Sequence, residues 1–376
     1  MKITINREQL VKQLTASCSI ISKSSIIPAL AHNLFRVLDE STMEIVSSSG
    51  DQEISLISRL AIEKTDGKLT NFVCHGATIL RTISILSSEF VVLEIKNQVV
   101  SFGTGKTKKK YQTPIDFGSD SFPLVKESIF NELEASIELT GDTFSQIIKS
   151  TTFLCAKDNM QQFKQGINII NHEGKTHFFT MNDSVSACAE FILDVDNKFP
   201  SQIIPSSIDK VSFLIEKSIK VSIYYSENFF KVTDGVYTII LRQIDAKTPD
   251  FLSVVKTAEK EKWFLVNRAE FMLALRRVSI YSNVITKSVT LTEEEDSITM
   301  VTEDKDYKKK ASENIEMFEN HNISGEISCS HEIMISILEK ITSEYVKIYF
   351  SEESNLLCIR PQNDDTKHFF ITKTRV

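Results

Sequence analysis

The segment FVCHGATILRTISILSSEFVVLEIKNQVVSF, residues 72–102, reveals how this 376-residue chain is organised, because its pattern occurs three times. Apolar residues fall at helical spacing in its first half, at Ile79 and Ile83, and alternate with polar ones in its second half, at Val91 and Leu93. The same order of helix, strand, turn and strand returns over residues 202–232 and 326–359. The chain therefore repeats one supersecondary unit.

A second, shorter segment also occurs three times. It combines a strand, a polar cap and an amphipathic helix, and reads ITINREQLVKQL from Ile3, IELTGDTFSQII from Ile137 and FLVNRAEFMLAL from Phe264. Asn6 and Asn267 stand where a helix N-cap is expected. Both patterns together predict six helices, over residues 7–17, 76–88, 141–152, 206–217, 268–279 and 330–341.

Equivalent positions of the repeats lie 124 to 134 residues apart, about a third of the chain. This spacing predicts three domains, over residues 1–127, 128–256 and 257–376, joined by connectors that contain Pro, Asp and Ser. The strands follow one another too closely for repeated crossovers, so we expect an α+β fold with two helices of each domain packed on mostly antiparallel sheets.

The composition fits a globular chain, with 41% hydrophobic and 25% charged residues and a net charge of −7. Only 11 glycines and 7 prolines argue against a collagen-like or low-complexity architecture. No signal peptide and no membrane span are evident, so we expect a cytoplasmic protein. The six cysteines are far apart and favour free thiols over disulfides or zinc, and we expect no cofactor.

No catalytic constellation is evident, and we expect no enzyme. The segment SFGTGKTKKKY, residues 101–111, suggests a phosphate-binding loop, but Val100 stands where such a loop needs its first glycine. The segment also joins two strands, so we interpret Lys106 and Lys108 to Lys110 as a charged hairpin that protects a sheet edge. A nucleotide hydrolase is therefore the least favoured function for this chain.

Several motifs, in this order along the chain, resemble those of the beta subunit of bacterial DNA polymerase III, the sliding-clamp family. The resemblance covers the whole chain. The motifs are the start MKITINREQL, IIPAL from Ile26, DFGSDSFPLV from Asp116, IDAKTPDFLSVV from Ile244, LRRVSIYSN from Leu275 and the end HFFITKTRV. LRRVSIYSN is most similar to clamps of the Bacteroidetes type. The resemblance implies a head-to-tail homodimeric ring around duplex DNA, with helices lining the hole and sheets outside.

Such a ring holds DNA without reading its sequence, so positive charge is expected on the lining helices. The six predicted helices carry a net charge of +3, against −10 for the rest of the chain. The DNA-facing candidates are Lys12, Lys23, Arg81, Lys149, Lys210, Lys217, Arg276 and Arg277. By resemblance, a basic residue is usual at Ser24, and Lys23 stands beside it.

The resemblance also places two protein-binding surfaces. The dimer interface would include Ile280, Tyr281 and Tyr111. A cleft for short motifs of the polymerase alpha subunit, the clamp loader and other partners would be formed by Asn182, Val185, Ala187, Pro249, Val254, Thr372, Thr374 and Arg375. The usual TDGHRLA-like and MPMRL-like walls are replaced by NDSVSAC and TKTRV, so the alternative is a divergent paralogue whose cleft is altered or lost.

Overall fold

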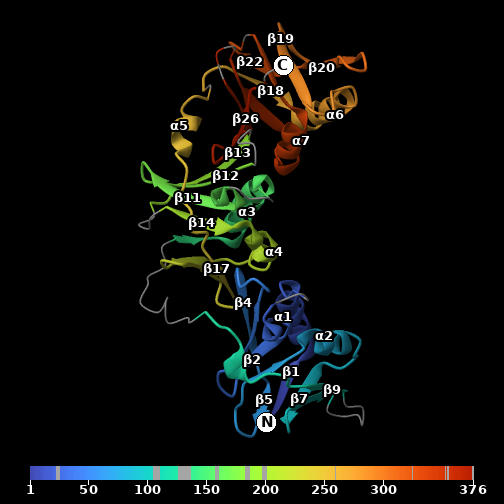
Figure 1. Cartoon of the computed structure of the whole chain (residues 1–376), viewed down its shortest axis with the longest axis vertical. Coiled ribbons are helices and arrows are strands. Elements are labelled where there is room, and N and C mark those ends of the chain that lie inside the picture. Colours follow the sequence, from blue (N-terminus) through green and yellow to red (C-terminus); the bar gives the residue numbers. More distant parts are fainter. Residues whose placement is uncertain are drawn as a thin grey trace. The chain divides into compact units, whose positions relative to one another are not determined.

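Figure 1 shows the chain as a computed structural model. The structure describes residues 1–22, 26–104, 111–125, 137–156, 161–182, 187–196, 201–258 (without the side chain of residue 254), 260–323, 325–351, 353 and 355–374. The chain divides into two compact units. Unit 1 comprises Met1–Gln146 and Ser207–Gln243, and unit 2 comprises Ile147–Ser206 and Ile244–Val376.

Unit 1 contains two antiparallel sheets. The five-stranded sheet has the order β5 (Lys64–Asp66), β1 (Lys2–Asn6), β7 (Phe90–Lys96), β8 (Val99–Gly103) and β9 (Tyr111–Pro114). The eight-stranded sheet has the order β10 (Ile137–Leu139), β15 (Val221–Tyr225), β16 (Phe229–Thr233), β17 (Tyr237–Arg242), β4 (Ile54–Ala61), β3 (Thr42–Ser48), β2 (Asn33–Val37) and β6 (Phe72–Cys74).

Helices α1 (Arg7–Ser19) and α2 (Gly76–Ser84) cover one face of these sheets (Figure 1). Leu10 and Leu14 of α1 and Ile79 and Ile83 of α2 are fully buried in one core with residues of both sheets. These four are the apolar positions at helical spacing, so the periodicity in the sequence marks the face that packs. The short helix α4 (Asp209–Ser212) also belongs to this unit.

Unit 2 also contains two antiparallel sheets. The nine-stranded sheet has the order β14 (Gln202–Pro205), β11 (Gly166–His172), β12 (Lys175–Met181), β13 (Ala187–Leu193), β26 (Lys367–Thr372), β25 (Leu356–Pro361), β24 (Tyr345–Tyr349), β18 (Trp263–Asn267) and β22 (Glu319–His321). The four-stranded sheet has the order β21 (Lys309–Glu316), β20 (Ser297–Asp304), β19 (Ser288–Glu294) and β23 (Glu326–Ser330).

Helices α6 (Arg268–Ser279) and α7 (His331–Lys340) pack on these sheets through Phe271, Leu275, Met334 and Ile337, which are fully buried. The helix α3 (Gly141–Thr151) has residues in both units, and α5 (Phe251–Val255) lies in unit 2. Short 3-10 turns occupy Pro28–Ala31, Ser119–Ser121, Thr152–Leu154, Gln162–Gln165 and Ser206–Ile208.

The α+β fold with paired helices on antiparallel sheets is confirmed, and five of the six predicted helices appear within a few residues of their expected bounds. The fourth, over residues 206–217, is shorter than predicted. After α4 the chain continues with i→i+3 hydrogen bonds, from the N–H of Leu214 to Val211 and from the N–H of Ile215 to Ser212. That bonding is the tighter 3-10 pattern, which forms only short pieces.

The threefold repeat is visible in single hydrogen bonds. The N–H of Arg7 donates to the carbonyl of Glu89 at 2.8 Å, and the N–H of Arg268 donates to that of Glu344 at 2.9 Å. The middle repeat makes the same bond from Gly141 to Ser218 at 2.8 Å. In each repeat the first residue of the first helix is thereby tied to the end of the segment that contains the second helix.

The predicted boundaries near residues 127 and 256 stay a prediction. The two compact units divide the chain elsewhere because each long sheet joins strands of two predicted domains. Strand β17 pairs with β4 in unit 1, and β13 pairs with β26 in unit 2. The middle third of the chain therefore contributes strands to both units.

Three further observations bear on the sequence predictions. All six cysteines are free thiols, as expected. In the described part of the chain, no helix is long and apolar enough to cross a membrane. The strands β8 and β9 pair as predicted around the lysine-rich segment, whose residues 105–110 lie outside the described ranges.

Candidate functional site

The first candidate site is the exposed surface of the helices. In unit 1, Lys12 lies on α1, Arg81 lies in the last turn of α2, and Lys210 and Lys217 lie on and after α4. All four side chains are exposed. The Nζ of Lys12 stands 6.0 Å from the ring centre of Tyr237, and no ion pair holds these cations within the described part of the chain. Lys12, Arg81 and Lys217 are therefore available to attract an anionic ligand, and Lys210 also has an electrostatic interaction with Asp51.

The cations in unit 2 are held differently. Arg276 forms an ion pair with Glu339 of α7, with an Nη2–Oε1 distance of 2.7 Å. Arg277 donates from Nε to Oε2 of Glu313 on β21 at 3.0 Å, and its Nη2 also contacts that carboxylate. These hydrogen bonds hold the pKa of Glu313 below its ordinary value. Both arginines are exposed but already have carboxylate partners, while Lys149 on α3 is exposed as well.

The first turns of α1 and α6 are stabilised by side-chain N-caps. Asn6 Oδ1 accepts from the N–H of Gln9 at 3.1 Å, and Asn267 Oδ1 accepts from those of Ala269 and Glu270. Both predicted caps are confirmed. Each cap satisfies backbone N–H groups that would otherwise lack a partner and so stabilises the first turn of its helix.

The second candidate site is a cavity of about 530 Å³ in unit 2. It brings together three residues of the predicted partner cleft, Asn182, Thr372 and Thr374. Asn182 is fixed because its Oδ1 accepts from the N–H of Ala187 at 3.0 Å while its own N–H donates to the carbonyl of Ala187. Thr374 is fixed by donating its N–H to the carbonyl of Ser328 at 2.7 Å.

Sequence reasoning missed the opposite wall of this cavity. Ile285, Lys287, Glu332 and Ile333 line it, and the Nζ of Lys287 lies 2.6 Å from Oε2 of Glu332. These residues come from the loop before β19 and from the start of α7, which are not neighbours in the sequence. The one signal in the sequence was the helix start at Ser330, whose hydroxyl accepts from the N–H of Ile333.

Of the remaining cleft candidates, Ala187 and Pro249 are not among the described residues that line the cavity. Ala187 is buried in the core and pairs with Ile371 on the neighbouring strand. Pro249 is half-buried just before α5, where Phe251 stacks on Phe179 with 4.1 Å between ring centres. The candidates Lys23, Val185 and Arg375 and the side chain of Val254 lie outside the described residues.

The third candidate site consists of exposed apolar side chains. Ile280 is 72% exposed and Tyr281 is 44% exposed, directly after α6 in unit 2. Tyr111 is 36% exposed on β9, the edge strand of the five-stranded sheet in unit 1. Exposed apolar groups that gather at one helix end mark a surface suited to contact with another protein chain.

Comparisons with known proteins agree at both ends of the chain. Residues 1–125 match the family model of the DNA polymerase III beta subunit N-terminal domain, and residues 256–375 match that of its C-terminal domain. The curated beta sliding clamp of Pseudomonas aeruginosa is 19% identical over the full length of both chains. That of Rickettsia bellii is 24% identical, also over the full length of both.

Solved structures show the same fold. The DNA polymerase sliding clamp from Pseudomonas aeruginosa superimposes with a TM-score of 0.86 at 17% identity and covers 100% of both chains. The DNA polymerase III beta subunit from Thermotoga maritima gives a TM-score of 0.83 at 19% identity, with 100% of this chain and 99% of that chain covered. By its sequence motifs, its family models and its fold, this chain belongs to the beta-subunit family of DNA polymerase III, the bacterial sliding clamps.

Proposed function

We propose that this chain is a DNA sliding clamp, in which two copies close head-to-tail into a ring around duplex DNA. The observation that carries the proposal is the likeness to beta sliding clamps over the full length of the chain. The ring tethers the polymerase to its template and makes synthesis processive, and this role requires no catalytic group. A full-length match of this kind favours the replicative clamp over the divergent paralogue.

The exposed cations of the helices support contact with DNA. A ring that slides needs attraction to phosphates without base readout, and lysine and arginine side chains on helix faces supply it. Lys12, Arg81, Lys210 and Lys217 are exposed and make no ion pair in the part of the chain that the structure describes. Lys149, Arg276 and Arg277 are the further candidates, and the two arginines carry carboxylate partners.

The apolar side chains of Ile280, Tyr281 and Tyr111 support the proposed dimer interface. Burying such side chains contributes about 1.5–3 kcal/mol each. In a head-to-tail ring, the end of α6 in one copy would meet the first domain of the other. A double change of Ile280→Ala and Tyr281→Ala should therefore shift the dimer toward monomer in sedimentation equilibrium.

The cavity of unit 2 supports a partner cleft with altered chemistry. By resemblance, Thr372 and Thr374 stand where clamps usually carry methionines, and Asn182 and the Lys287–Glu332 ion pair add polar groups. We infer that the alpha subunit, the clamp loader and other motif-bearing partners bind this cavity through more polar contacts than is usual in the family. The proposed compartment is the cytoplasm, where replication takes place.

The deciding experiment is clamp loading. The purified chain is loaded onto nicked circular DNA by the clamp loader from its own source and passed over a gel-filtration column, before and after the circle is linearised. A sliding clamp stays with the circle and is lost from the linear form, because only a closed ring around an endless duplex is held topologically. A strict monomer at micromolar concentration, with no loader-dependent retention, would contradict the proposal.

A further inference from the structure

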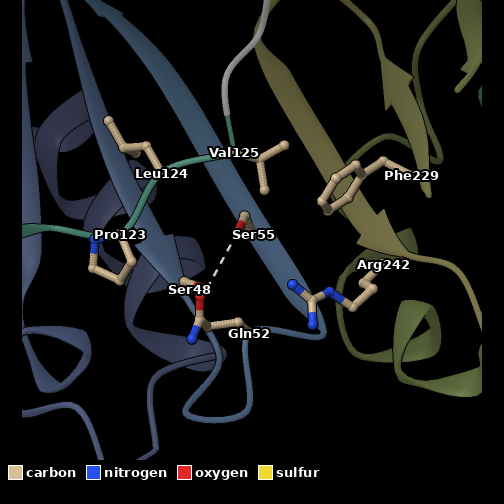
Figure 2. A pocket seen from close by; sticks show the side chains of 8 residues that line it. All are labelled: Ser48, Gln52, Ser55, Pro123, Leu124, Val125, Phe229 and Arg242. Carbon is tan, nitrogen blue, oxygen red and sulfur yellow. Dashed lines mark hydrogen bonds between the residues drawn. The ribbon is translucent and has the colours of Figure 1, made fainter. Parts of the chain in front are cut away.

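A hollow lies at one end of the eight-stranded sheet of unit 1, with a volume of about 250 Å³ (Figure 2). It lies on the face turned away from α1 and α2. On that face Val46, Ile57 and Ile240 are buried together with residues of the connector that follows β9. Because side chains alternate along a strand, the same face carries the residues two positions farther toward the sheet end, which are Ser48, Ser55 and Arg242.

The floor of the hollow is formed by small side chains. Ser55 Oγ donates to Ser48 Oγ at 3.2 Å, and Ser48 Oγ donates to the carbonyl of Ile54 at 3.3 Å. Both hydroxyl hydrogens are therefore used, and the serines offer only acceptor capacity to a ligand. The side chains of Ser48 and Ser55 are much shorter than those of Val46 and Ile57, their neighbours on this face. The shorter side chains leave the hollow open.

The walls combine apolar side chains with one cation, and Phe229 and Arg242 lie side by side on paired strands. Leu124 and Val125 come from the connector and Phe229 comes from β16, while Arg242 extends its guanidinium from β17 toward the strand that carries Ser55 (Figure 2). Leu124 is 40% exposed. The hollow thus joins an apolar surface to five guanidinium donors.

The guanidinium of Arg242 has no ion pair within the residues that the structure describes. Its backbone N–H donates to the carbonyl of Glu53 at 2.9 Å, but the Glu53 carboxylate forms no ion pair with it. Gln52, at the rim, has a left-handed backbone with φ of 59°. Non-glycine residues in that region are uncommon, and they gather at functional sites.

We propose that this hollow binds a short segment of a partner protein in which an acidic side chain stands beside an apolar one. Carboxylates pair with arginine through two parallel hydrogen bonds, and the neighbouring aliphatic side chain covers Leu124, Val125 and Phe229. A volume of about 250 Å³ is smaller than the range of about 300–1,000 Å³ of pockets that enclose whole small-molecule ligands. It suits one or two side chains of a peptide.

This hollow differs in chemistry from the cavity of unit 2. There the cation Lys287 is already paired with Glu332, so an acidic side chain would have to displace a carboxylate. At Arg242 the same side chain meets a guanidinium that has no ion-pair partner among the described residues. The two surfaces therefore favour different segments, and variants of Arg242 distinguish binding at this hollow from binding at the cavity of unit 2.

The test uses the full-length protein and a fluorescent, end-blocked peptide with a central Leu-Asp-Leu, followed by anisotropy. A second peptide carries Asn in place of Asp. We expect the Asp peptide to bind about tenfold more tightly, because a charge-assisted pair is lost with Asn. Arg242→Gln should remove this difference, and Ser55→Leu, which fills the floor, should weaken both peptides.

Two controls locate the effect. Lys64→Gln removes an exposed cation from β5, in the other sheet of the unit, and should leave binding unchanged. Glu53→Gln removes the acidic neighbour and should strengthen binding of the Asp peptide. Equal binding of the two peptides, full binding by Arg242→Gln, or no binding of the Asp peptide up to millimolar concentration would each overturn the proposal.

Discussion

The helix pair α1–α2 of unit 1 and the helix pair α6–α7 of unit 2 share a scaffold but differ in surface charge. In the first pair Arg7 Nε donates to the carbonyl of Ser88 at 2.9 Å, and in the second Arg268 Nε donates to that of Ser343 at 3.0 Å. The exposed cations differ. Lys12 and Arg81 have no ion-pair partner among the described residues, whereas Arg276 and Arg277 on α6 are ion-paired.

This difference shows that a repeat can keep its backbone while its electrostatic role changes. The arginines at the helix starts are part of the scaffold, because each guanidinium donates to at least one backbone carbonyl of its own unit. Part of the donor capacity and charge of Arg276 and Arg277 is already taken by Glu339 and Glu313, which weakens their attraction for a phosphate. Direct phosphate contacts should therefore come mainly from the first helix pair.

The largest expected effect tests the shared scaffold. Arg268→Ala should lower the free energy of unfolding by about 3 kcal/mol, since hydrogen bonds to charged groups contribute about 1.5–3 kcal/mol each and Arg268 also donates to the carbonyl of Leu338 at 3.1 Å. Arg7→Ala, with one such bond, should cost about 2 kcal/mol. Urea unfolding followed by circular dichroism measures both. Equal losses of a few tenths of a kcal/mol would show that these arginines act at the surface instead.

The second effect tests the charge difference. Lys12→Gln with Arg81→Gln should reduce the slope of log K against log salt for DNA binding by about two, one unit for each lost phosphate contact. Arg276→Gln with Arg277→Gln should reduce it by less than one. Fluorescence anisotropy with duplex DNA at several salt concentrations measures the slopes. If the Arg276 and Arg277 changes reduced the slope more than the Lys12 and Arg81 changes, the ion pairs of α6 would have to open on DNA. The second helix pair would then be the main phosphate-binding surface.

A matched pair of variants sharpens this result. Glu313→Gln with Glu339→Gln frees both arginines of α6 without removing a cation. The affinity for duplex DNA should then rise and its salt dependence should become steeper. Unchanged binding would mean that Arg276 and Arg277 face away from DNA.

The shared scaffold could be predicted from the sequence, but the difference in charge could not. Helix periodicity and the caps at Asn6 and Asn267 are local, so they are visible within a dozen residues. The ion pair of Arg276 joins residues 63 positions apart. The repeat pattern in the sequence does not predict it. The net charge of +3 counted over the predicted helices therefore includes two arginines that are already neutralised, one of them by a residue outside those helices.

The cavity of unit 2 shows the same limit. Its C-terminal wall, at Thr372 and Thr374, could be placed by resemblance because the end of the chain is easy to align. The wall formed by Ile285 and Lys287 could not, because it depends on how a loop after α6 folds back toward α7. Ala187, a cleft candidate, is buried in the core of unit 2, and its place in the cleft stays a prediction.

The third effect concerns the helix caps. Asn6→Ala and Asn267→Ala should each lower the free energy of unfolding by about 1 kcal/mol. The loss at Asn267 should be the larger, because its Oδ1 accepts two backbone N–H groups and that of Asn6 accepts one. Thermal unfolding of the single variants measures this order. Equal losses would mean that the second hydrogen bond of Asn267 adds nothing in solution.

The smallest effect is a dependence on pH that only the second helix pair should show. The hydrogen bond from Arg277 lowers the pKa of Glu313 in the folded chain, while the unfolded chain keeps a value near 4.3. A group whose pKa is lowered on folding stabilises the fold above its unfolded pKa, and this contribution disappears as the pH falls through the folded pKa. Glu313→Gln should therefore destabilise the protein slightly at pH 7 and progressively less below about pH 4. Lys12 has no ion-pair partner among the described residues. Lys12→Gln should therefore change the free energy of unfolding by the same amount at pH 7 and below about pH 4. If the two variants responded alike to pH, the ion pair of Arg277 would not persist in solution, and the two helix pairs would be electrostatically equivalent.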